Sequence, residues 1–351
     1  MKGRKIYTTV LLLGISASLG MGVSAQRISD SERLLMENIR LRQANDSLRH
    51  ALYVLQDNTV FTLWDEITGL AQDSDNEYDY SCFGLDGVRQ ETEHMKKISA
   101  CVPSFTIAYN DIFDKYIDLY TISRKGSMPY VLGRYYKHLP EFRKVFSKYG
   151  VPEELTALCI VESAVSPRAL SKAGALGLWQ LMPETARMYG LVVDEAVDQR
   201  LDVSLSTDAA ARVLRDLRKS LGSWELAVLA YNCGAGTIRK AIILSGSNGV
   251  WDIYQHLPAE TRAYLPSFIG ARYCDIYRAE YGIKEKTYAK DSFDVYVVSS
   301  DSPIVRIAAE AGVPDTLLAE INCQYIAGIV PSGMAVRVPR GLAKKLKEAN
   351  L

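Results

Sequence analysis

Residues 149–190 read YGVPEELTALCIVESAVSPRALSKAGALGLWQLMPETARMYG, and this stretch decides the fold that we expect. Pro152 and the two acidic residues after it suit the first turn of a helix, where proline is tolerated and negative charge is favoured. Helical spacing then places on one face Leu155, Leu158, Cys159 and Glu162. A carboxyl group therefore occupies an otherwise apolar helix face.

Glu162 is a candidate catalytic acid. Burial disfavours the ionised carboxylate and raises its pKa, so such a glutamate can stay protonated near neutrality and donate its proton to a leaving-group oxygen. Spacing alone favours a different interpretation, a buried acid neutralised by an arginine. The following Val165-Ser166-Pro167 reverses that preference, because a helix that stops there brings Glu162 to a loop mouth where a substrate can reach it.

Two later segments carry side chains typical of a ligand site. Residues 171–180, SKAGALGLWQ, contain glycines that let a ligand approach the backbone, and a Trp and a Gln that suit sugar faces and amides. Residues 230–236, AYNCGAG, end an apolar helix face that begins at Trp224. Tyr231 thus repeats the placement of Glu162, and a core tyrosine with a satisfied hydroxyl is the alternative.

The surrounding residues predict a mainly α fold. From about residue 104 to residue 281, apolar residues repeat on one face of each segment with the helical period. First helical turns are predicted to begin at Pro129, Pro140, Pro152, Pro183 and Pro258. We expect an all-helical, lysozyme-like domain over residues 104–285, with its catalytic core at residues 140–281.

The C-terminal residues follow a different pattern. Alternation with polar residues predicts two short strands, one containing Phe293, Val295 and Val297 and the other containing Met334, Val336 and Val338. Two short helical patterns between them begin at Ser302-Pro303 and at Pro314. The βααβ order over residues 290–341 resembles a divergent LysM glycan-binding module, and a packing appendage is the alternative. Residues 342–351 form a C-terminal tail.

The N-terminal residues predict export. A basic start, an apolar run over residues 6–21 and small residues ending at Ala25 are typical of a signal peptide over residues 1–25. A membrane anchor is the alternative, but the strongly apolar run is shorter than the roughly 20 residues of a spanning helix. No cysteine follows the cleavage region, so a lipoprotein acyl chain has no attachment site there.

Leucines recur every seven residues in the next segment, residues 26–57, at Leu34, Leu41, Leu48 and Leu55. This spacing fits a short coiled coil that pairs two chains as a homodimer, and it equally fits an amphipathic helix lying on the protein's own body. Residues 58–103, which include a polar, acidic stretch, are expected to be an irregular linker.

Composition excludes several partners and cofactors. Without residues 1–25 the 351-residue chain has 38 Lys and Arg against 41 Asp and Glu, a net charge of −3, which argues against nucleic acid. The six cysteines form no CxxC pair. The four histidines are also scattered along the chain, so we expect no metal and no cofactor.

Four ordered motifs resemble those of soluble-lytic-transglycosylase-like domains. They are Glu162-Ser163, then GLWQLMP at residues 177–183, AYNCG at residues 230–234 and LPAETRAY at residues 257–264. The resemblance is strongest to the membrane-bound lytic murein transglycosylase D group. Four motifs in the same order are far more specific than any one of them.

The resemblance implies a goose-lysozyme-like fold and cleavage of the β-1,4 bond between N-acetylmuramic acid and N-acetylglucosamine of peptidoglycan. Glu162 is then the catalytic acid and afterwards the base, and the residues that line the glycan site are Ser171, Gln180, Met182, Tyr231, Asn232 and Tyr264. One carboxylate suffices, because the C6 hydroxyl of the substrate attacks C1 and forms a 1,6-anhydro ring. The resemblance also implies a periplasmic enzyme, peripherally associated with the outer membrane or cell wall.

Two other functions remain open. A hydrolytic muramidase on the same fold needs a second carboxylate, for which the candidates are Asp194, Glu195, Asp198 and Asp202. We expect these acids instead to pair with Arg200 and to occupy a helix end, with the helix cap near Ser204 or Ser206. The other alternative is a wall-binding scaffold without turnover.

The cysteines pose a separate question. Cys82 and Cys101 both lie outside the motifs, and export allows a disulfide between them worth about 3 kcal/mol. Two free thiols are the alternative. Cys159 and Cys233, where the family commonly has alanine at the second position, raise the same question of a thiol pair beside Glu162.

Overall fold

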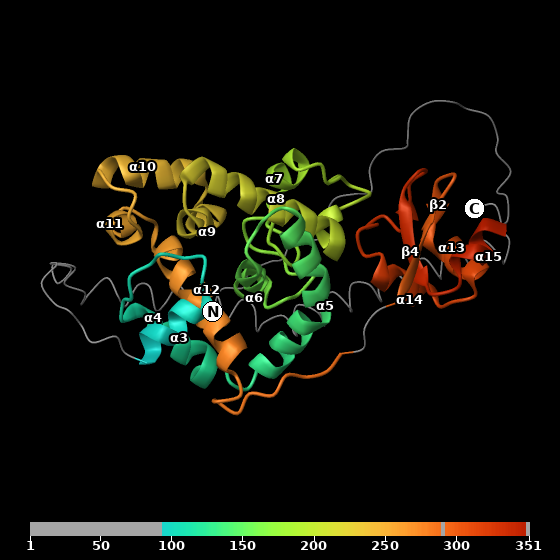
Figure 1. Ribbon diagram of the computed structural model, residues 1–351. Helices are drawn as coiled ribbons and strands as arrows, with labels where there is room; N and C mark the ends of the chain where they lie inside the picture. Colours follow the sequence, from blue (N-terminus) through green and yellow to red (C-terminus); the bar gives the residue numbers. More distant parts are fainter. Residues whose placement is uncertain (1–92, 289–291, 349–351) are drawn as a thin grey trace, which may run out of the picture. The chain divides into compact units, whose positions relative to one another are not determined.

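The structure, a computed structural model, describes residues 93–288 and 292–348 (Figure 1). The predicted signal peptide, the leucine-rich segment and most of the predicted linker therefore lie outside the described residues. Residues 93–288, here called the helical region, consist of helices and loops, and residues 292–348, here called the C-terminal module, contain helices and short strands. This arrangement confirms the mainly α fold class.

The helical region is built around one hydrophobic core. Its helices are α3 (Glu93–Cys101), α4 (Ile112–Asp118), the π-helical turn η2 (Leu119–Ser123), α5 (Met128–Lys148), the 3-10 helix η3 (Glu153–Ala157), α6 (Leu158–Ser163), α7 (Pro183–Met188), the 3-10 turn η4 (Gln199–Leu201), α8 (Val203–Leu221), α9 (Trp224–Cys233), α10 (Ala235–Ser245), α11 (Val250–Tyr254) and α12 (Ala259–Tyr277). None of the helices in the described ranges is long and apolar enough to cross a membrane.

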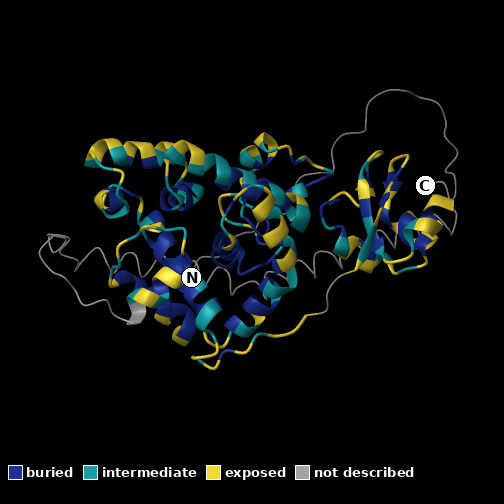
Figure 2. Ribbon diagram, in the orientation of Figure 1, coloured by how far each residue is buried: buried dark blue, intermediate teal, exposed yellow. Residues whose placement is uncertain are grey.

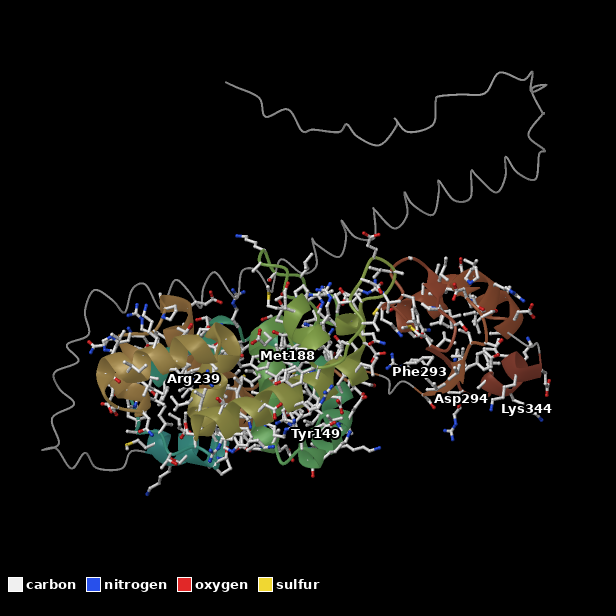
Figure 3. All side chains as sticks on the ribbon, turned by 90° about the horizontal axis from the view of Figure 1, so that it is seen from above. Tyr149, Met188, Arg239, Phe293, Asp294 and Lys344 are labelled. Carbon is white, nitrogen blue, oxygen red and sulfur yellow. The ribbon has the colours of Figure 1, made fainter. Side chains whose placement is uncertain are left out.

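The prediction that a helix begins at Pro140 is wrong. Pro140 lies inside helix α5 and does not begin a new one. Leu139 and Phe142 are both buried, and their packing on the two sides of the proline outweighs its cost of about 3 kcal/mol to a helix. The helix ends at Lys148, and the hydroxyl of the next residue, Tyr149, labelled in Figure 3, donates a hydrogen bond to Asp208 of α8 at 2.6 Å.

The helix predicted to begin at Pro152 forms as two pieces, η3 and α6. The predicted apolar face is nonetheless correct, because Leu155, Leu158 and Cys159 are fully buried together with the carboxyl-bearing Glu162. Helix α6 packs against both α5 and α12, and it is buried throughout in Figure 2. A six-residue helix of this kind is stabilised by tertiary packing, since so short a helix is unstable alone.

Helix α12 passes through the core and contacts α3, α4, α6 and α9. It is apolar on nearly all sides, as expected of a helix that is surrounded by others. Tyr264 and Ser267 are both buried on it, and Ser267 shares a hydrogen bond of 2.8 Å with the hydroxyl of Tyr120 in η2. This path carries Tyr264 to the end of α6.

The C-terminal module contains β1 (Phe293–Val297), β2 (Ser302–Pro303), α13 (Ile304–Ala311), α14 (Asp315–Ile321), β3 (Ile329–Val330), β4 (Ala335–Pro339) and α15 (Ala343–Glu348). Strand β1 pairs antiparallel with β4, and β2 pairs with β3. The predicted order of strand, helix, helix and strand is confirmed. The sequence did not predict the β2–β3 pair or α15, which lies in the predicted tail.

The buried face of β1 is not the one that the alternation of valines suggested. Tyr296 and Val298 point into the core of the module, whereas Val295 and Val297 are exposed. The large ring of Tyr296 buries more apolar surface than a valine, which favours this register. The C-terminal module also takes one residue from the helical region into its core, Val197.

Of the four cysteines with a predicted pairing, the structure describes Cys101, Cys159 and Cys233. Cys101 is a fully buried thiol, and Cys82 lies outside the described residues, so the disulfide between them stays a prediction. Burial raises the pKa of Cys101 to about 12, so its thiol stays protonated and unreactive. Cys159 and Cys233 are free thiols and form no disulfide with each other.

Candidate active site

Glu162 lies at the end of α6 with only 6% of its surface exposed. Burial raises the pKa of its carboxyl to about 8, and the negative charge of Glu260 raises it as well. The hydroxyl of Tyr264 donates a hydrogen bond to Oε1 of Glu162, which acts in the opposite direction because it stabilises the carboxylate. At neutral pH the carboxyl therefore carries a proton that it can donate.

The chain reverses direction immediately after Glu162. Ala164 and Val165 have φ angles of 48° and 61°, the left-handed conformation that residues other than glycine rarely adopt. The amide of Val165 donates to the carbonyl of Cys159 at 3.0 Å, which closes the turn onto α6. The helix thus ends just after Glu162, as expected, and the left-handed turn at Ala164 and Val165 ends it before Pro167 is reached.

Tyr231 lies in the last turn of α9, as the sequence predicted. Its hydroxyl donates a hydrogen bond of 2.7 Å to the carbonyl of Trp179, so it holds the loop before α7. Burial raises the pKa of Tyr231, and the nearby charge of Glu162 raises it further. The structure therefore brings Glu162, Tyr231 and Tyr264 together from three helices.

Residues 171–181 form a compact loop beside this cluster. The hydroxyl of Ser171 accepts a hydrogen bond from the amide of Ala175 at 3.0 Å, and Nε2 of Gln180 donates to the carbonyl of Ala169 at 2.8 Å. These two predicted glycan-site side chains therefore shape the loop itself. Met182, at the end of the loop, is 38% exposed and presents an apolar side chain to solvent.

Trp179 does not have the role that the sequence suggested. Its ring is fully buried between Phe142 and Phe146 of α5, and Nε1 donates to the hydroxyl of Thr207 at 2.9 Å. It therefore cannot stack on a sugar. The sequence showed an aromatic residue next to glycines, but it could not show which way the ring points.

Arg200 holds the loop of residues 171–181 in place through buried contacts. It forms a buried ion pair with Asp198 at 2.7 Å and donates hydrogen bonds to the carbonyls of Gly174 and Leu181 at 2.8 and 3.0 Å. Gly177 lies so close to Arg200 that a Cβ atom there would meet the Arg200 carbonyl oxygen at 2.2 Å. The loop is thus fixed to a buried charge pair.

Three of the four acids between residues 194 and 202, Asp194, Asp198 and Asp202, serve structural purposes, as predicted. Asp194 accepts hydrogen bonds from two backbone amides of its own loop, and Asp198 pairs with Arg200. Asp202 caps α8 by accepting from the amide of Leu205 at 3.0 Å, so the cap is this residue and not Ser204 or Ser206. An aspartate is an equally good cap, and it precedes both serines.

Asn232 is held by the first turn of α12. The hydroxyl of Thr261 donates to its Oδ1 at 2.7 Å, and its Nδ2 donates to Oε1 of Glu260 at 3.3 Å. Glu260 and Thr261 were not among the predicted site residues. A signal was present, because Glu260 stands four residues before Tyr264 and so lies on the same face of the helix.

Residues 142–253 match the family of the transglycosylase SLT domain. The helical region contains an SLT domain. The chain is 36% identical over 217 residues to membrane-bound lytic murein transglycosylase D of Escherichia coli strain K12, which covers 58% of this chain and 46% of that relative. Membrane-bound lytic murein transglycosylase C of Photorhabdus laumondii is 31% identical over 159 residues, covering 38% and 44%. The chain thus spans less than half the length of these relatives.

A solved structure, the 70 kDa soluble lytic transglycosylase SLT70 of Escherichia coli, is also similar. It is 25% identical, with a TM-score of 0.34, over 39% of this chain and 24% of that one. Glu162 and Tyr231 lie inside the stretch that matches the SLT family, whereas Tyr264 lies beyond its end. The contact between Tyr264 and Glu162 is therefore a finding of the structure.

The SLT domain offers acid–base chemistry without an evident metal centre. In the part of the chain that the structure describes, no group of three or more His, Cys, Asp and Glu side chains is placed to hold a metal ion. The groups gathered at the end of α6 are a protonated carboxyl and two phenols. The carboxyl can donate a hydrogen bond to an oxygen-rich ligand, whereas the phenol protons of Tyr231 and Tyr264 are already donated to the Trp179 carbonyl and to Glu162.

Proposed function

We propose that this protein is a lytic transglycosylase that cleaves the β-1,4 bond between N-acetylmuramic acid and N-acetylglucosamine of peptidoglycan. The observation that carries the proposal is the buried Glu162, whose raised pKa keeps a transferable proton at neutral pH inside an SLT domain. The relatives named lytic murein transglycosylases support the substrate.

In the proposed reaction Glu162 transfers its proton to the glycosidic oxygen as the bond from C1 to that oxygen breaks. The Glu162 carboxylate then accepts the proton of the C6 hydroxyl, and the C6 oxygen forms a new bond to C1. This gives a 1,6-anhydro ring and returns Glu162 to its protonated form. The substrate's N-acetyl group helps to stabilise the intermediate, and the Tyr264 hydroxyl stabilises the carboxylate between the two proton transfers.

A single carboxyl is enough for this reaction, because the nucleophile belongs to the substrate. Three of the four acids that a hydrolytic muramidase was expected to use, Asp194, Asp198 and Asp202, are occupied by backbone amides, Arg200 and the cap of α8. The carboxylate whose charge reaches Glu162 is that of Glu260, and it accepts a hydrogen bond from Asn232. Glu260 is therefore the candidate base in the hydrolytic alternative.

The remaining residues of the site are assigned by what they present. We propose that Tyr231 and Asn232 contact the sugar near the reacting bond, and that Met182 packs on an apolar sugar face. Ser171 and Gln180 bind glycan chiefly through the loop whose shape they hold.

The decisive experiment is mass spectrometry of the muropeptides released from purified peptidoglycan. A transglycosylase releases products one water lighter than those of a hydrolase, because their muramic acid ends are 1,6-anhydro rings. Glu162→Gln should abolish release, and Glu280→Gln, which changes an exposed acid paired with Lys97 outside the site, is the matched control. Ordinary reducing ends would identify a muramidase, and release by Glu162→Gln at the wild-type rate would refute the assignment of the acid.

We extend the proposal to the location of the enzyme and to its flanking parts. Peptidoglycan lies outside the cytoplasmic membrane, so we propose export through residues 1–25 to the periplasm, with a mature chain that begins at Gln26. N-terminal sequencing of the exported protein tests this. We further propose that the C-terminal module binds glycan as LysM modules do, and that residues 26–57 pair two chains, which sedimentation with and without those residues tests.

A further inference from the structure

The left-handed turn behind Glu162 needs an explanation. Two consecutive residues with side chains, Ala164 and Val165, adopt positive φ, and a β-branched residue such as valine is especially disfavoured there. Strain of this kind persists only where the surrounding structure holds it. Something must therefore favour this turn over a continued helix or an extended exit.

Arg134 of α5 supplies that contact. Its Nη2 and Nε atoms both donate hydrogen bonds to the carbonyl oxygen of Ala164, at 2.8 and 3.3 Å. Among the described residues, this carbonyl is the partner of both hydrogen bonds that the guanidinium donates. The carbonyl lies just past the end of α6, where a positive charge is favourable.

The bonded carbonyl belongs to the peptide group between the two strained residues. Its orientation is set by ψ of Ala164, which is 33°, and by φ of Val165, which is 61°. Two donors that converge on one carbonyl oxygen fix the position of that oxygen and so restrict the rotation of its peptide group. Arg134 therefore acts on the two torsions that distinguish this turn from a right-handed helix.

We propose that Arg134 is a positioning residue, which holds the Ala164–Val165 turn and thereby fixes the end of α6 that carries Glu162. The proposal rests on the proposed function, since it concerns the placement of the acid. Ser163 supports the same arrangement, because its hydroxyl bonds the carbonyl of Leu178 at 2.9 Å and links the turn to the loop of residues 171–181.

An electrostatic role is the competing explanation for a cation at this place. A positive charge close to Glu162 would favour the carboxylate and lower its pKa. The groups that shift the pKa of Glu162 are burial, Tyr264 and Glu260, and Arg134 is not among them. Arg134 thus holds the turn without neutralising the acid.

The test is a double-mutant cycle with Arg134→Met and Ala164→Gly. Glycine adopts positive φ without steric cost, so Ala164→Gly removes the strain at one of the two residues and makes the turn depend less on the arginine. We expect Arg134→Met to lower kcat by about tenfold to a hundredfold with little change in KM, because a small misplacement of a catalytic group has effects of this size. The double variant should recover part of that loss, because Val165 keeps its own positive φ, and the Tm should follow the same pattern.

Arg143→Met is the matched control, since Arg143 lies on the same helix in an exposed ion pair with Glu153. Arg134→Lys separates charge from geometry, because lysine keeps the charge but loses the planar fork. Loss of activity with lysine and recovery with Ala164→Gly support positioning. Full activity with lysine, or no recovery in the double variant, overturns it.

Failure of the proposed function is distinguishable from failure of this inference. If the wild-type protein releases no muropeptides, the proposed function fails, and the Tm cycle still decides whether Arg134 holds the turn. If the wild type is active and Arg134→Met matches both the wild type and Arg143→Met in kcat and Tm, the inference fails alone.

Discussion

Two neighbours act on the carboxyl of Glu162 in opposite directions. Tyr264 donates a hydrogen bond that favours the carboxylate, so Tyr264→Phe should raise the pKa of Glu162 above its value of about 8. A general acid works only while protonated, so the alkaline limb of the profile of kcat/KM against pH should move to higher pH. An unmoved or lower limb would contradict the contact seen here.

Glu260 provides the opposite test. Its negative charge raises the pKa of Glu162, so Glu260→Gln should lower that pKa and move the alkaline limb to lower pH. Glutamine keeps an oxygen that can accept the hydrogen bond from Asn232, which limits the change to the charge. The same measurement of kcat/KM against pH checks the direction. Loss of all activity in this variant, with hydrolytic products in the wild type, would instead indicate that Glu260 is a base.

Glu162 should also make the fold less stable as the pH rises. The carboxyl titrates near 4.5 when unfolded and near 8 when folded, so the stability that it contributes is complete below pH 4.5 and is lost as the pH rises to about 8. Glu162→Gln removes this loss. The difference in free energy of unfolding between variant and wild type should grow by roughly 1.4 kcal/mol per pH unit across that window. Urea denaturation at several pH values measures it, and a constant difference would contradict a raised pKa.

Some residues of the site could be identified from the sequence, and others could not. Glu162 and Tyr231 could be found, because each is a polar group at the end of an apolar helix face. Trp179 was misjudged, since the direction of its ring depends on Phe142 and Phe146, which lie far before it in the chain. Arg134 gave no signal, because one arginine on an amphipathic helix resembles any other.

Among the elements, the loop of residues 171–181 depends most on one glycine. Gly177 has a φ of 86° and lies against the Arg200 carbonyl, whereas Gly174 has a φ of 90° with open space around it. Alanine at either position bears the cost of the left-handed conformation, but at Gly177 the Cβ also collides with backbone. We expect Gly177→Ala to be less stable than Gly174→Ala by about 2 kcal/mol and to lose activity.

Thermal or urea unfolding of both variants checks this expectation, with release of muropeptides as the second readout. Equal stability of the two variants would mean that the contact with Arg200 does not hold the loop.

Helices were predictable where burial follows one face, as in α5 and α8, but their ends were less so. Pro140 was expected to begin a helix and lies inside α5, because packing on both sides continues it. The stop just after Glu162 was expected from Val165-Ser166-Pro167 and is confirmed, but the sequence did not show that a left-handed turn at Ala164 and Val165 produces it. Local signals give the identity of an element, and tertiary contacts set its limits.

At the scale of the whole molecule, residues 196–202 link two sets of contacts. On one side Arg200 fixes the loop of residues 171–181. On the other, Val197 enters the core of the C-terminal module, and the amide of Asp198 donates to the carbonyl of Gln324 at 2.8 Å. No sequence pattern could show this link, because it joins residues more than a hundred positions apart.

Arg337 tests the same link from the C-terminal module. Its guanidinium pairs with the carboxylate of Asp202 at 2.7 Å, and Asp202 is nearly fully buried where it also caps α8. Arg337→Met leaves that carboxylate without its cation. This should lower the free energy of unfolding by about 1 to 3 kcal/mol, less than the loss of a fully buried pair, because Arg337 is partly exposed.

Arg340→Met, which changes an exposed arginine just after β4, is the matched control. Differential scanning calorimetry should show a lower Tm for Arg337→Met only. Equal Tm values for the two variants would show that this ion pair does not stabilise the molecule. The contacts between the module and the helical region would then depend on Val197 and on the backbone hydrogen bond from Asp198 to Gln324.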